Sequence, residues 1–334
     1  MQSMAAPDRT PFNTRLVRTV CQRQGWQFLD LDGGEGYLFA VEAGGRRVHC
    51  GSGAICAYPG NSATAYTIAR DKAFTAAMLA EAGLPHLPTS LYFLETTRRH
   101  LRAPGRERAD LEQWGATASY PVFAKPNRGA HGDLAEQIRD HDGLLDYLDR
   151  AARTYDQVVV QPYVEAAEFR VLVVAGEARF QYQKVSGGLV GDGQSSWREL
   201  LESLNRNLQD NALSPVTGTD FAAGLEARGQ GADDISEAGV SVLLPGRGNL
   251  ATGGQAVGFT TDVDPDLSGL AVGATKVLGL DVAGVDLLRP APGAPVVLEV
   301  NANPSFASLE SIGEHAVAEA LWTDILARAL AAAP

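Results

Sequence analysis

The apolar positions along the chain predict helices and strands in alternation. Helices are expected where apolar residues recur with a period near 3.6 before a glycine or proline, and strands where short apolar runs lie between turn residues. The predicted helices are Phe12–Gly25, Asp71–Ala82, Asp142–Thr154, Trp197–Asn205, Asp266–Gly279 and a closing helical region, Glu310–Ala331. The predicted strands are Tyr37–Val41, Arg46–Cys50, Leu91–Leu94, Pro121–Lys125, Val158–Tyr163, Phe169–Val174, Ala178–Lys184, Val282–Leu288 and Val296–Val300. This interleaving, with several hairpins, predicts an α/β or α+β fold with mixed sheets.

Length and charge narrow the class of protein. A chain of 334 residues is too long for one small core and predicts two or three packed units. Hydrophobic residues make up 45% and charged residues 20%, which is a globular composition. The formal net charge of -12 argues against a nucleic-acid partner, because such proteins need clustered Lys and Arg. A local basic pocket for phosphates is compatible with that charge.

The N-terminus and the cysteines predict a cytoplasmic protein. Residues 1–15 lack the apolar core of a signal peptide, and no apolar run is long enough to span a bilayer. We therefore expect no membrane partner. Cys21, Cys50 and Cys56 show no metal-type spacing, so we expect reduced thiols that pack as small apolar residues.

The strongest chemical signal lies on two apolar strands near the C-terminus. Asp286 is on the first, and Glu299 and Asn301 are on the next. Residues two apart on a strand point to the same face, and Asp286 can join that face if the strands pair. Two carboxylates and an amide oxygen suit Mg²⁺, which also keeps phosphate oxygens and waters. Either carboxylate alone is more simply explained by pairing with Arg or Lys across the sheet, whereas the three together favour a metal.

Two lysines and a glycine-bearing turn predict a phosphate site. Lys125 ends a strand and directly precedes the segment 126–132, which contains Gly129 and Gly132. Exposed backbone N–H groups and an adjacent ammonium can hold a polyphosphate, although no Walker A motif is present. Lys72, on the helix predicted at Asp71–Ala82, is a second candidate, with an ordinary solvated lysine as the alternative. Alone, these signals are weak, because most glycine-rich turns only turn the chain.

Two further segments carry weaker signals. The strand that ends at Gln161-Pro162-Tyr163-Val164-Glu165 could present its backbone to an adenine edge, with Glu168 near a ribose. By itself this stretch would be called structural. The loop 247–254 places Arg247 beside a glycine-rich turn, where it could stabilise a developing oxyanion, with a surface turn as the alternative.

The order of these segments resembles the ATP-grasp superfamily of carboxylate–amine ligases, most of all the branch with cyanophycin synthetase and the ribosomal-protein glutamate ligases. The resembling part runs from Arg70-Asp71-Lys72 to Asn301-Ala302-Asn303-Pro304. The resemblance implies an ATP-grasp fold, with two α/β subdomains that clasp ATP and a small N-terminal α/β domain before them. The implied units are residues 1–70, 71–160 and 161–334. The implied reaction activates a carboxylate as an acyl phosphate, joins it to an amine and releases ADP and phosphate.

The resemblance also assigns roles to individual residues. It implies ATP binding by Lys72, Lys125, Gly129, His131, Gly132, Gln161, Tyr163, Val164, Glu168, Arg170 and Asn249. It implies Asp286, Glu299 and Asn301 as ligands of Mg²⁺, or of Mn²⁺ in its place, and Arg247 and Lys125 as catalytic residues. The implied substrates are a small-molecule carboxylate and an amine, of the amino-acid or peptide kind. A homo-oligomer is a further expectation, since relatives often form dimers or tetramers.

The chain departs from the family pattern at three places. Leu134 stands where the phosphate loop usually has another glycine, Gln161 stands where the hinge usually has an acid, and Ser305 stands where a glycine is common. The first departure bears on the mobility of the segment 127–134, which we expect to be mobile without nucleotide. The last borders the acceptor pocket, so the substrates are left open.

Three rival functions are weighed against the ligase. A nucleotide-binding relative without catalysis would explain Leu134 but not the retained lysines and metal ligands. A Rossmann dehydrogenase is disfavoured, because Gly34-Glu35-Gly36 and Gly191-Asp192-Gly193 lack the third glycine of the dinucleotide fingerprint. An ATP-grasp enzyme that uses a hydroxyl nucleophile is the third.

Overall fold

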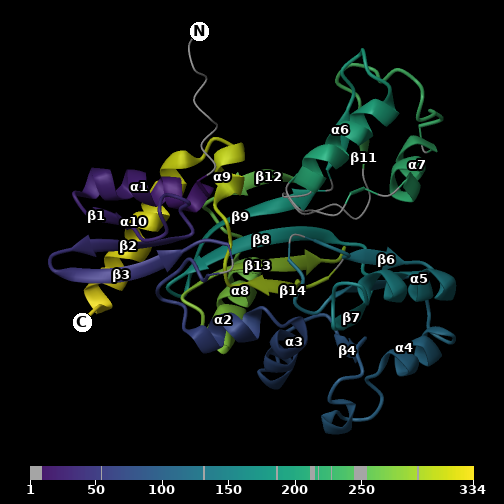
Figure 1. The fold of residues 1–334 in the computed structure, drawn as a ribbon, viewed down its shortest axis with the longest axis horizontal. Coiled ribbons are helices and arrows are strands. Elements are labelled where there is room, and N and C mark those ends of the chain that lie inside the picture. The colour runs from purple at the N-terminus through teal and green to yellow at the C-terminus, as the bar shows by residue number, and fades with distance from the viewer. Residues whose placement is uncertain are drawn as a thin grey trace.

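The structure is a computed structural model that describes residues 10–53, 55–130, 132–185, 187–210, 215–216, 218–226, 228–243, 254–291 and 293–334. Its strands form three larger sheets and one two-stranded ribbon, arranged as in Figure 1. None of the helices within the described residues combines the length and the apolar character that crossing a membrane requires.

The N-terminal unit is a three-stranded antiparallel sheet with a helix against it. Its elements are α1 (Phe12–Gln24), β1 (Gln27–Asp30), β2 (Leu38–Ala43) and β3 (Arg46–Gly51), with the strand order β1-β2-β3. The predicted helix and hairpin are confirmed, and α1 ends as predicted at Gly25, whose φ of +68° suits a residue without Cβ. Strand β1 was not predicted, because four residues with two exposed ends carry no readable alternation.

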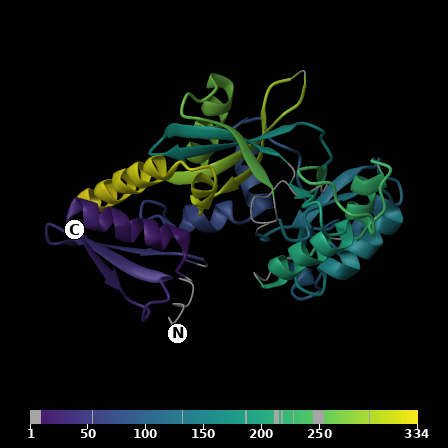
Figure 2. The same ribbon diagram turned by 90° about the horizontal axis from the view of Figure 1, so that it is seen from above.

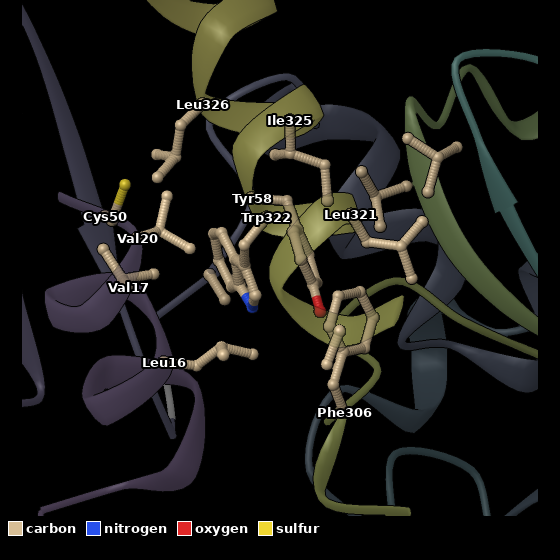
Figure 3. Close-up of a cluster of buried hydrophobic side chains, with 14 of the residues drawn as sticks. Leu16, Val17, Val20, Cys50, Tyr58, Phe306, Leu321, Trp322, Ile325 and Leu326 are labelled. Atoms are coloured by element: carbon tan, nitrogen blue, oxygen red, sulfur yellow. The ribbon is translucent and has the colours of Figure 1, made fainter. Parts of the chain in front are cut away.

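An aromatic core joins this unit to the rest of the protein. Helix α10 (His315–Ala332) packs against α1 and β3 and inserts Trp322 between the two sides. Tyr58 stacks on Trp322 with ring centroids 5.1 Å apart, and Phe306 packs beside both rings, as Figure 3 shows. The same core includes buried side chains of the large sheet described below, so the N-terminal sheet and that sheet share one hydrophobic interior.

The middle unit is a four-stranded antiparallel sheet, ordered β4-β7-β5-β6. Its elements are β4 (Ser90–Phe93), a 3-10 turn (Arg99–Leu101), α4 (Arg108–Gly115), β5 (Val122–Pro126), β6 (Glu136–Ile138), α5 (His141–Ala151) and β7 (Gln157–Pro162). Helices α4 and α5 share a core with one face of the sheet, through Val122, Ala124, Val158 and Val160. Side chains alternate along a strand, so Lys125 and Gln161 project from the opposite face.

The largest sheet has five antiparallel strands in the order β12-β9-β8-β13-β14. Its strands are β8 (Ala167–Val174), β9 (Glu177–Val185), β12 (Gln255–Thr260), β13 (Val282–Arg289) and β14 (Val296–Asn301). One face packs against α8 (Pro265–Leu278), with α2 (Ala63–Ala69) and α3 (Lys72–Glu81) beside it. Helix α8 begins at the side-chain cap of Asp264 and ends at Gly279, whose φ is +69°. The other face carries the residues of the candidate site at one end and the shared aromatic core at the other.

An insertion between β9 and β12 forms a small unit of its own. It contains β10 (Gly188–Val190), α6 (Trp197–Asp210), α7 (Gly218–Glu226) and β11 (Ser241–Leu243), and β10 pairs with β11. Trp197 is fully buried in the core of this unit. In Figure 1 the insertion lies above the end of the large sheet, and the middle unit lies below it; Figure 2 shows the same units from above.

One feature of the predicted architecture was wrong, and another is refined. Mixed sheets were expected, but the strand pairs within these four sheets are all antiparallel. The closing helical region is split into α9 (Ala307–Ser311) and α10, with Gly313 at a φ of +82° between them. The division into units 1–70, 71–160 and 161–334 stays a prediction, and helix α3 of the second unit packs on α8 of the third.

Candidate active site

The three proposed metal ligands lie on one face of paired strands. In the β13–β14 register, Asp286 stands directly opposite Glu299, and Gly284 stands opposite Asn301. Opposite residues of an antiparallel pair share a face, so the carboxylates of Asp286 and Glu299 and the amide of Asn301 project to the same side. Both flanking residues of Asp286, Val285 and Leu287, pack on the α8 side instead. The geometry expected from the sequence is therefore present.

Asp286 is also paired with cations of neighbouring strands. Arg170 on β8 stands opposite it and donates two hydrogen bonds, from Nε to Oδ1 and from Nη2 to Oδ2, both 2.7 Å long. Lys184 Nζ on β9 lies 3.3 Å from Oδ2 and also donates to the carboxylate of Glu168. Asp286 is only 4% exposed. The pairing across the sheet that was the alternative for a single carboxylate therefore coexists with the arrangement that suits a metal.

Lys184 belongs to the site, although the sequence analysis did not single it out. Its side chain is 8% exposed and joins two carboxylates, so it contributes a buried ammonium to the cluster. A signal was present in the sequence: Phe180, Tyr182 and Lys184 alternate on one strand, and the first two are buried. A lysine in phase with buried aromatics must find a carboxylate or a ligand, since a buried charge is costly without a partner.

Lys72 and Lys125 approach Glu299 from two different elements, α3 and β5. Lys72 Nζ lies 3.6 Å from Glu299 Oε1, and Lys125 Nζ lies 3.8 Å from Oε2. Lys72 is the first residue of helix α3, whose N-cap Asp71 accepts a hydrogen bond from the backbone N–H of Phe74. Lys125 is on β5 of the middle sheet and is 5% exposed. The structure thus brings the two lysines together at β14, the strand that carries the proposed metal ligands Glu299 and Asn301.

The predicted phosphate loop is anchored at its start. The Oδ1 of Asn127 accepts from the backbone N–H of Ala73, its Nδ2 donates to Gln157 Oε1, and its own carbonyl accepts from the N–H of Lys72. Asn127 is completely buried. Lys72 Nζ also donates to the carbonyl of Gly129, at 3.0 Å. These contacts hold Asn127 and the carbonyl of Gly129 on α3 and argue against mobility at the start of the segment 127–134; mobility of the rest without nucleotide stays a prediction.

Leu134 occupies a backbone conformation that favours glycine. Its φ is +47°, in the left-handed region that costs a residue with a Cβ roughly 1–2 kcal/mol. Its side chain packs on the core of the middle unit. Just before it, Asp133 accepts a hydrogen bond from the hydroxyl of Tyr155 at 2.5 Å. The departure noted in the sequence is therefore a strained position that packing and a neighbouring hydrogen bond hold in place.

Gln161 lines a small pocket between the middle sheet and strand β14 of the five-stranded sheet. Lys72, Thr89, Gln161, Leu298 and Glu299 are among the residues around this pocket. Gln161 Nε2 donates to Thr89 Oγ1 at 2.8 Å, whereas its Oε1 is buried without a hydrogen-bond partner in the described part of the chain. A buried amide oxygen without a partner is a ready acceptor for a donor on a ligand.

The remaining predicted residues differ in what the structure says of them. Glu168 is in the Lys184–Asp286 cluster, and Gly132 adopts a φ of +74° in the loop. Tyr163 and Val164 follow directly after β7, and Tyr163 is exposed. His131, Arg247 and Asn249 lie outside the described residues, so their roles stay predictions.

Mutual pairing keeps the site ionised. Burial opposes ionisation of Asp286, but Arg170 and Lys184 outweigh it and lower the pKa of that carboxyl to about 2. Burial likewise opposes the charge of Glu299, and Lys72 and Lys125 lower its pKa nevertheless. Burial lowers the pKa of Lys125, although Glu299 works against that shift, while the carboxylates Asp286 and Glu168 raise the pKa of Lys184. The site therefore contains buried charges of both signs, which suit the binding of a polyanion together with a cation.

The donor set fits a magnesium ion held together with a nucleotide. Within the described residues, no cluster of three or more His, Cys, Asp or Glu side chains could hold a metal by itself. Asp286, Glu299 and Asn301 supply two carboxylates and one amide oxygen. Mg²⁺ is usually held by one or two carboxylates plus phosphate oxygens and waters, so this partial set is suitable.

Comparison with known proteins points to one group. A family model described as a RimK-like ATP-grasp domain matches residues 245–324. Cyanophycin synthetase from Geminocystis herdmanii is 29% identical over 258 residues, covering 72% of this chain and 28% of the relative. The glutathione biosynthesis bifunctional protein GshAB from Mannheimia succiniciproducens is 28% identical over 261 residues, covering 71% of this chain and 32% of the relative. This chain spans less than a third of the length of either relative.

Solved structures agree on the fold. A bifunctional glutathione synthetase from Pasteurella multocida superposes with a TM-score of 0.58 and 21% identity, covering 96% of this chain and 45% of that one. A D-alanine–D-alanine ligase from Bacillus anthracis superposes with a TM-score of 0.50 and 15% identity, covering 80% of this chain and 70% of that one. At identities of 21% and 15%, the likeness shows that this chain shares the fold of these two proteins.

Proposed function

We propose that this chain is a member of the ATP-grasp superfamily and an ATP-dependent ligase that joins a carboxylate to an amine. The observation that carries the proposal is the meeting of Lys72, Lys125 and Glu299 beside Asp286. This arrangement places cations for a polyphosphate against oxygen ligands for Mg²⁺. ATP is the proposed nucleotide, and the substrates are of the amino-acid or peptide kind.

The lysines and the loop would hold the triphosphate. Lys72 and Lys125 neutralise phosphate charge, and backbone N–H groups of the segment 129–134 add donors. Gln161 offers its free amide oxygen to the exocyclic amine of adenine, with Tyr163 and Val164 beside the base and Glu168 at the ribose. Magnesium, held by Asp286, Glu299 and Asn301, would offset the charge that builds up on the transferring phosphoryl group.

The reaction balances as two displacements. A substrate carboxylate oxygen attacks the γ-phosphorus, the bond to the β-phosphate oxygen breaks, and ADP leaves. The amine nitrogen then attacks the carbonyl carbon of the acyl phosphate, the bond from that carbon to the phosphate oxygen breaks, and phosphate leaves with the proton that the amine loses as the amide forms. Arg247 is proposed to stabilise the tetrahedral intermediate, and Lys125 to stabilise the transferring phosphoryl group. Water must be excluded, because an acyl phosphate hydrolyses, so the segment 129–134 is proposed to close over the nucleotide.

The comparisons support catalysis over a purely nucleotide-binding role. The matched relatives are a synthetase and a biosynthetic protein, and the chain keeps both lysines and all three oxygen ligands. A binder without catalysis would not need the opposed carboxylates of Asp286 and Glu299.

A condensation screen tests the proposal. The protein is incubated with ATP, Mg²⁺ and mixed amino acids and dipeptides, and mass spectrometry detects products that have lost one water. ADP is measured in the same samples. We expect a condensation product and matching ADP, both lost in Lys125→Met and Glu299→Gln. Lys276→Met, at an exposed position in the last turn of α8, is the matched control and should keep activity.

Three outcomes would change the proposal. ATP binding without any ADP formation would favour the non-catalytic relative. An ester product would indicate a hydroxyl nucleophile in place of the amine. Full activity in both site variants would remove the proposed phosphate and metal positions.

A further inference from the structure

The carboxylate of Asp286 is already occupied by protein cations. Arg170 takes both of its oxygens in a bidentate pair, and Lys184 contacts Oδ2 as well. Bidentate guanidinium–carboxylate pairs are among the stronger hydrogen-bonded contacts in proteins, and this one is buried. A metal ion that binds Asp286 must therefore share the carboxylate with these cations or displace one of them.

The charges at the site disfavour a metal ion that arrives alone. Among the described residues, the cluster contains the cations Lys72, Lys125, Arg170 and Lys184 and the carboxylates Glu168, Asp286 and Glu299. Cations thus outnumber carboxylates before any ligand binds. A divalent ion would add to this excess in a buried place, whereas a nucleotide triphosphate would more than cancel it.

The surroundings of Arg170 give its side chain room and a second partner. It extends over Gly284, where a Cβ would lie 3.5 Å from both Cδ and Nε of Arg170, so the glycine leaves that side open. Tyr182 stands opposite Arg170 on β9, and its hydroxyl is buried with no hydrogen-bond partner in the described regions. The pair between Arg170 and Asp286 does not use this hydroxyl. Its oxygen is therefore available to accept a hydrogen bond from the guanidinium.

We propose that Arg170 is a placeholder cation for the metal site. In the absence of nucleotide it neutralises Asp286 and keeps a lone divalent ion out. When nucleotide and metal arrive together, the guanidinium leaves Asp286, takes the hydroxyl of Tyr182 as a partner and turns its remaining N–H groups to the phosphate oxygens. Metal and nucleotide then bind as a unit, and Arg170 acts as a positioning residue. This inference rests on the proposed function, which supplies the nucleotide.

Manganese binding without nucleotide tests the placeholder directly. Free Mn²⁺ is measured by electron paramagnetic resonance while it is titrated into the wild type and into Arg170→Gln. Removing one adjacent positive charge should tighten Mn²⁺ binding by about tenfold or more. A merely structural role would leave the affinity unchanged or weaken it, and either result overturns the inference. The double variant Arg170→Gln with Asp286→Asn should lose the gain.

Additional variants and a thermal measurement control for misfolding and for general effects of charge. Arg170→Lys keeps the charge but cannot take both oxygens of Asp286, so its Mn²⁺ affinity should lie between the other two. If Arg170→Gln is only marginally stable, Mn²⁺ should raise its melting temperature more than that of the wild type. Arg179→Gln removes a cation that pairs with Asp324 on α10 and should leave Mn²⁺ binding unchanged.

A non-hydrolysable ATP analogue separates the two proposals. With the analogue present, Mn²⁺ affinity should rise strongly in the wild type and much less in Arg170→Gln, since the placeholder is already absent there. No analogue binding to the wild type would count against the proposed function. Analogue binding with equal coupling in both proteins would leave that function standing and overturn the role of Arg170.

Discussion

Replacing Asn61 by alanine should be among the most damaging single changes in the protein. Asn61 lies in the segment after the N-terminal sheet and is 8% exposed. Its Nδ2 donates to the carbonyls of Val282 and Ala302, at 2.8 and 3.0 Å, and its Oδ1 accepts from the N–H groups of Asp281 and Val282, at 2.8 and 2.9 Å. The side chain uses all four of its hydrogen-bonding positions to hold the start of β13 beside the residue that follows β14.

The size of the effect follows from those four bonds. A typical intramolecular hydrogen bond contributes about 1 kcal/mol net, and a buried group left without a partner costs more. Four such bonds give about 4 kcal/mol of lost unfolding free energy for Asn61→Ala. Water entering the space left behind would reduce that value toward about 2 kcal/mol.

Equilibrium unfolding in urea measures this loss. Tryptophan fluorescence is a suitable signal, because Trp322 is buried in the core shared by the N-terminal sheet and the large sheet. Asn205→Ala is the matched control: Asn205 bridges to the backbone of Val216 with two bonds, within the insertion. Its effect should be about half as large. A loss below about 1 kcal/mol for Asn61→Ala would refute the reasoning.

Three other predictions concern the site and its loop. At Leu134, glycine should be more stable than alanine by about 1 kcal/mol in thermal unfolding, reversing their usual order, because both lose the packing and only glycine relieves the positive φ; alanine equal to or above glycine would contradict this. The lowered pKa of Asp286, about 2, means that its ionisation stabilises the fold above pH 4, roughly the unfolded pKa, and that this contribution falls away as the pH drops toward 2. Unfolding of Asp286→Asn and the wild type between pH 7 and 2 should therefore converge at the acid end, and a constant difference would count against it. Without nucleotide, amide hydrogen exchange should be fast at 129–134 and slow at Asn127, with ATP slowing only the former; equal rates in both segments would exclude the closing loop.

Local pattern was enough to predict much of the fold and part of the site. The two-residue period of β14 places Glu299 and Asn301 on one face, and the short connection to β13 predicts the pairing that brings Asp286 there. Glycine stops such as Gly25 and Gly279 mark helix ends, because a left-handed terminal residue is needed there.

What the sequence did not reveal depends on contacts between distant segments. Asn61 bonds to strands more than 200 positions away, and Asn303 accepts from the N–H of Ala57 across 246 positions. No local pattern marks an asparagine for such a role. Pairing of Asp286 with an Arg or Lys across the sheet was the alternative considered, but Arg170 could not be identified as the partner, because that requires the antiparallel β8–β13 register, which an expectation of mixed sheets leaves undetermined.

The core around Trp322 also bears on the order in which the protein can form during synthesis. The N-terminal sheet leaves the ribosome before the middle and large sheets, yet the helix that closes its interior comes from residues 315–332. Until that helix emerges, Val17, Phe39 and Tyr58 have no cover on that side and stay exposed to chaperones or to other nascent chains. The buried core of the middle sheet comes from residues 111–160, with Tyr92 and Leu94 packed against it, and can form much earlier. The N-terminal sheet is thus expected to become native after the middle sheet, although it is translated earlier.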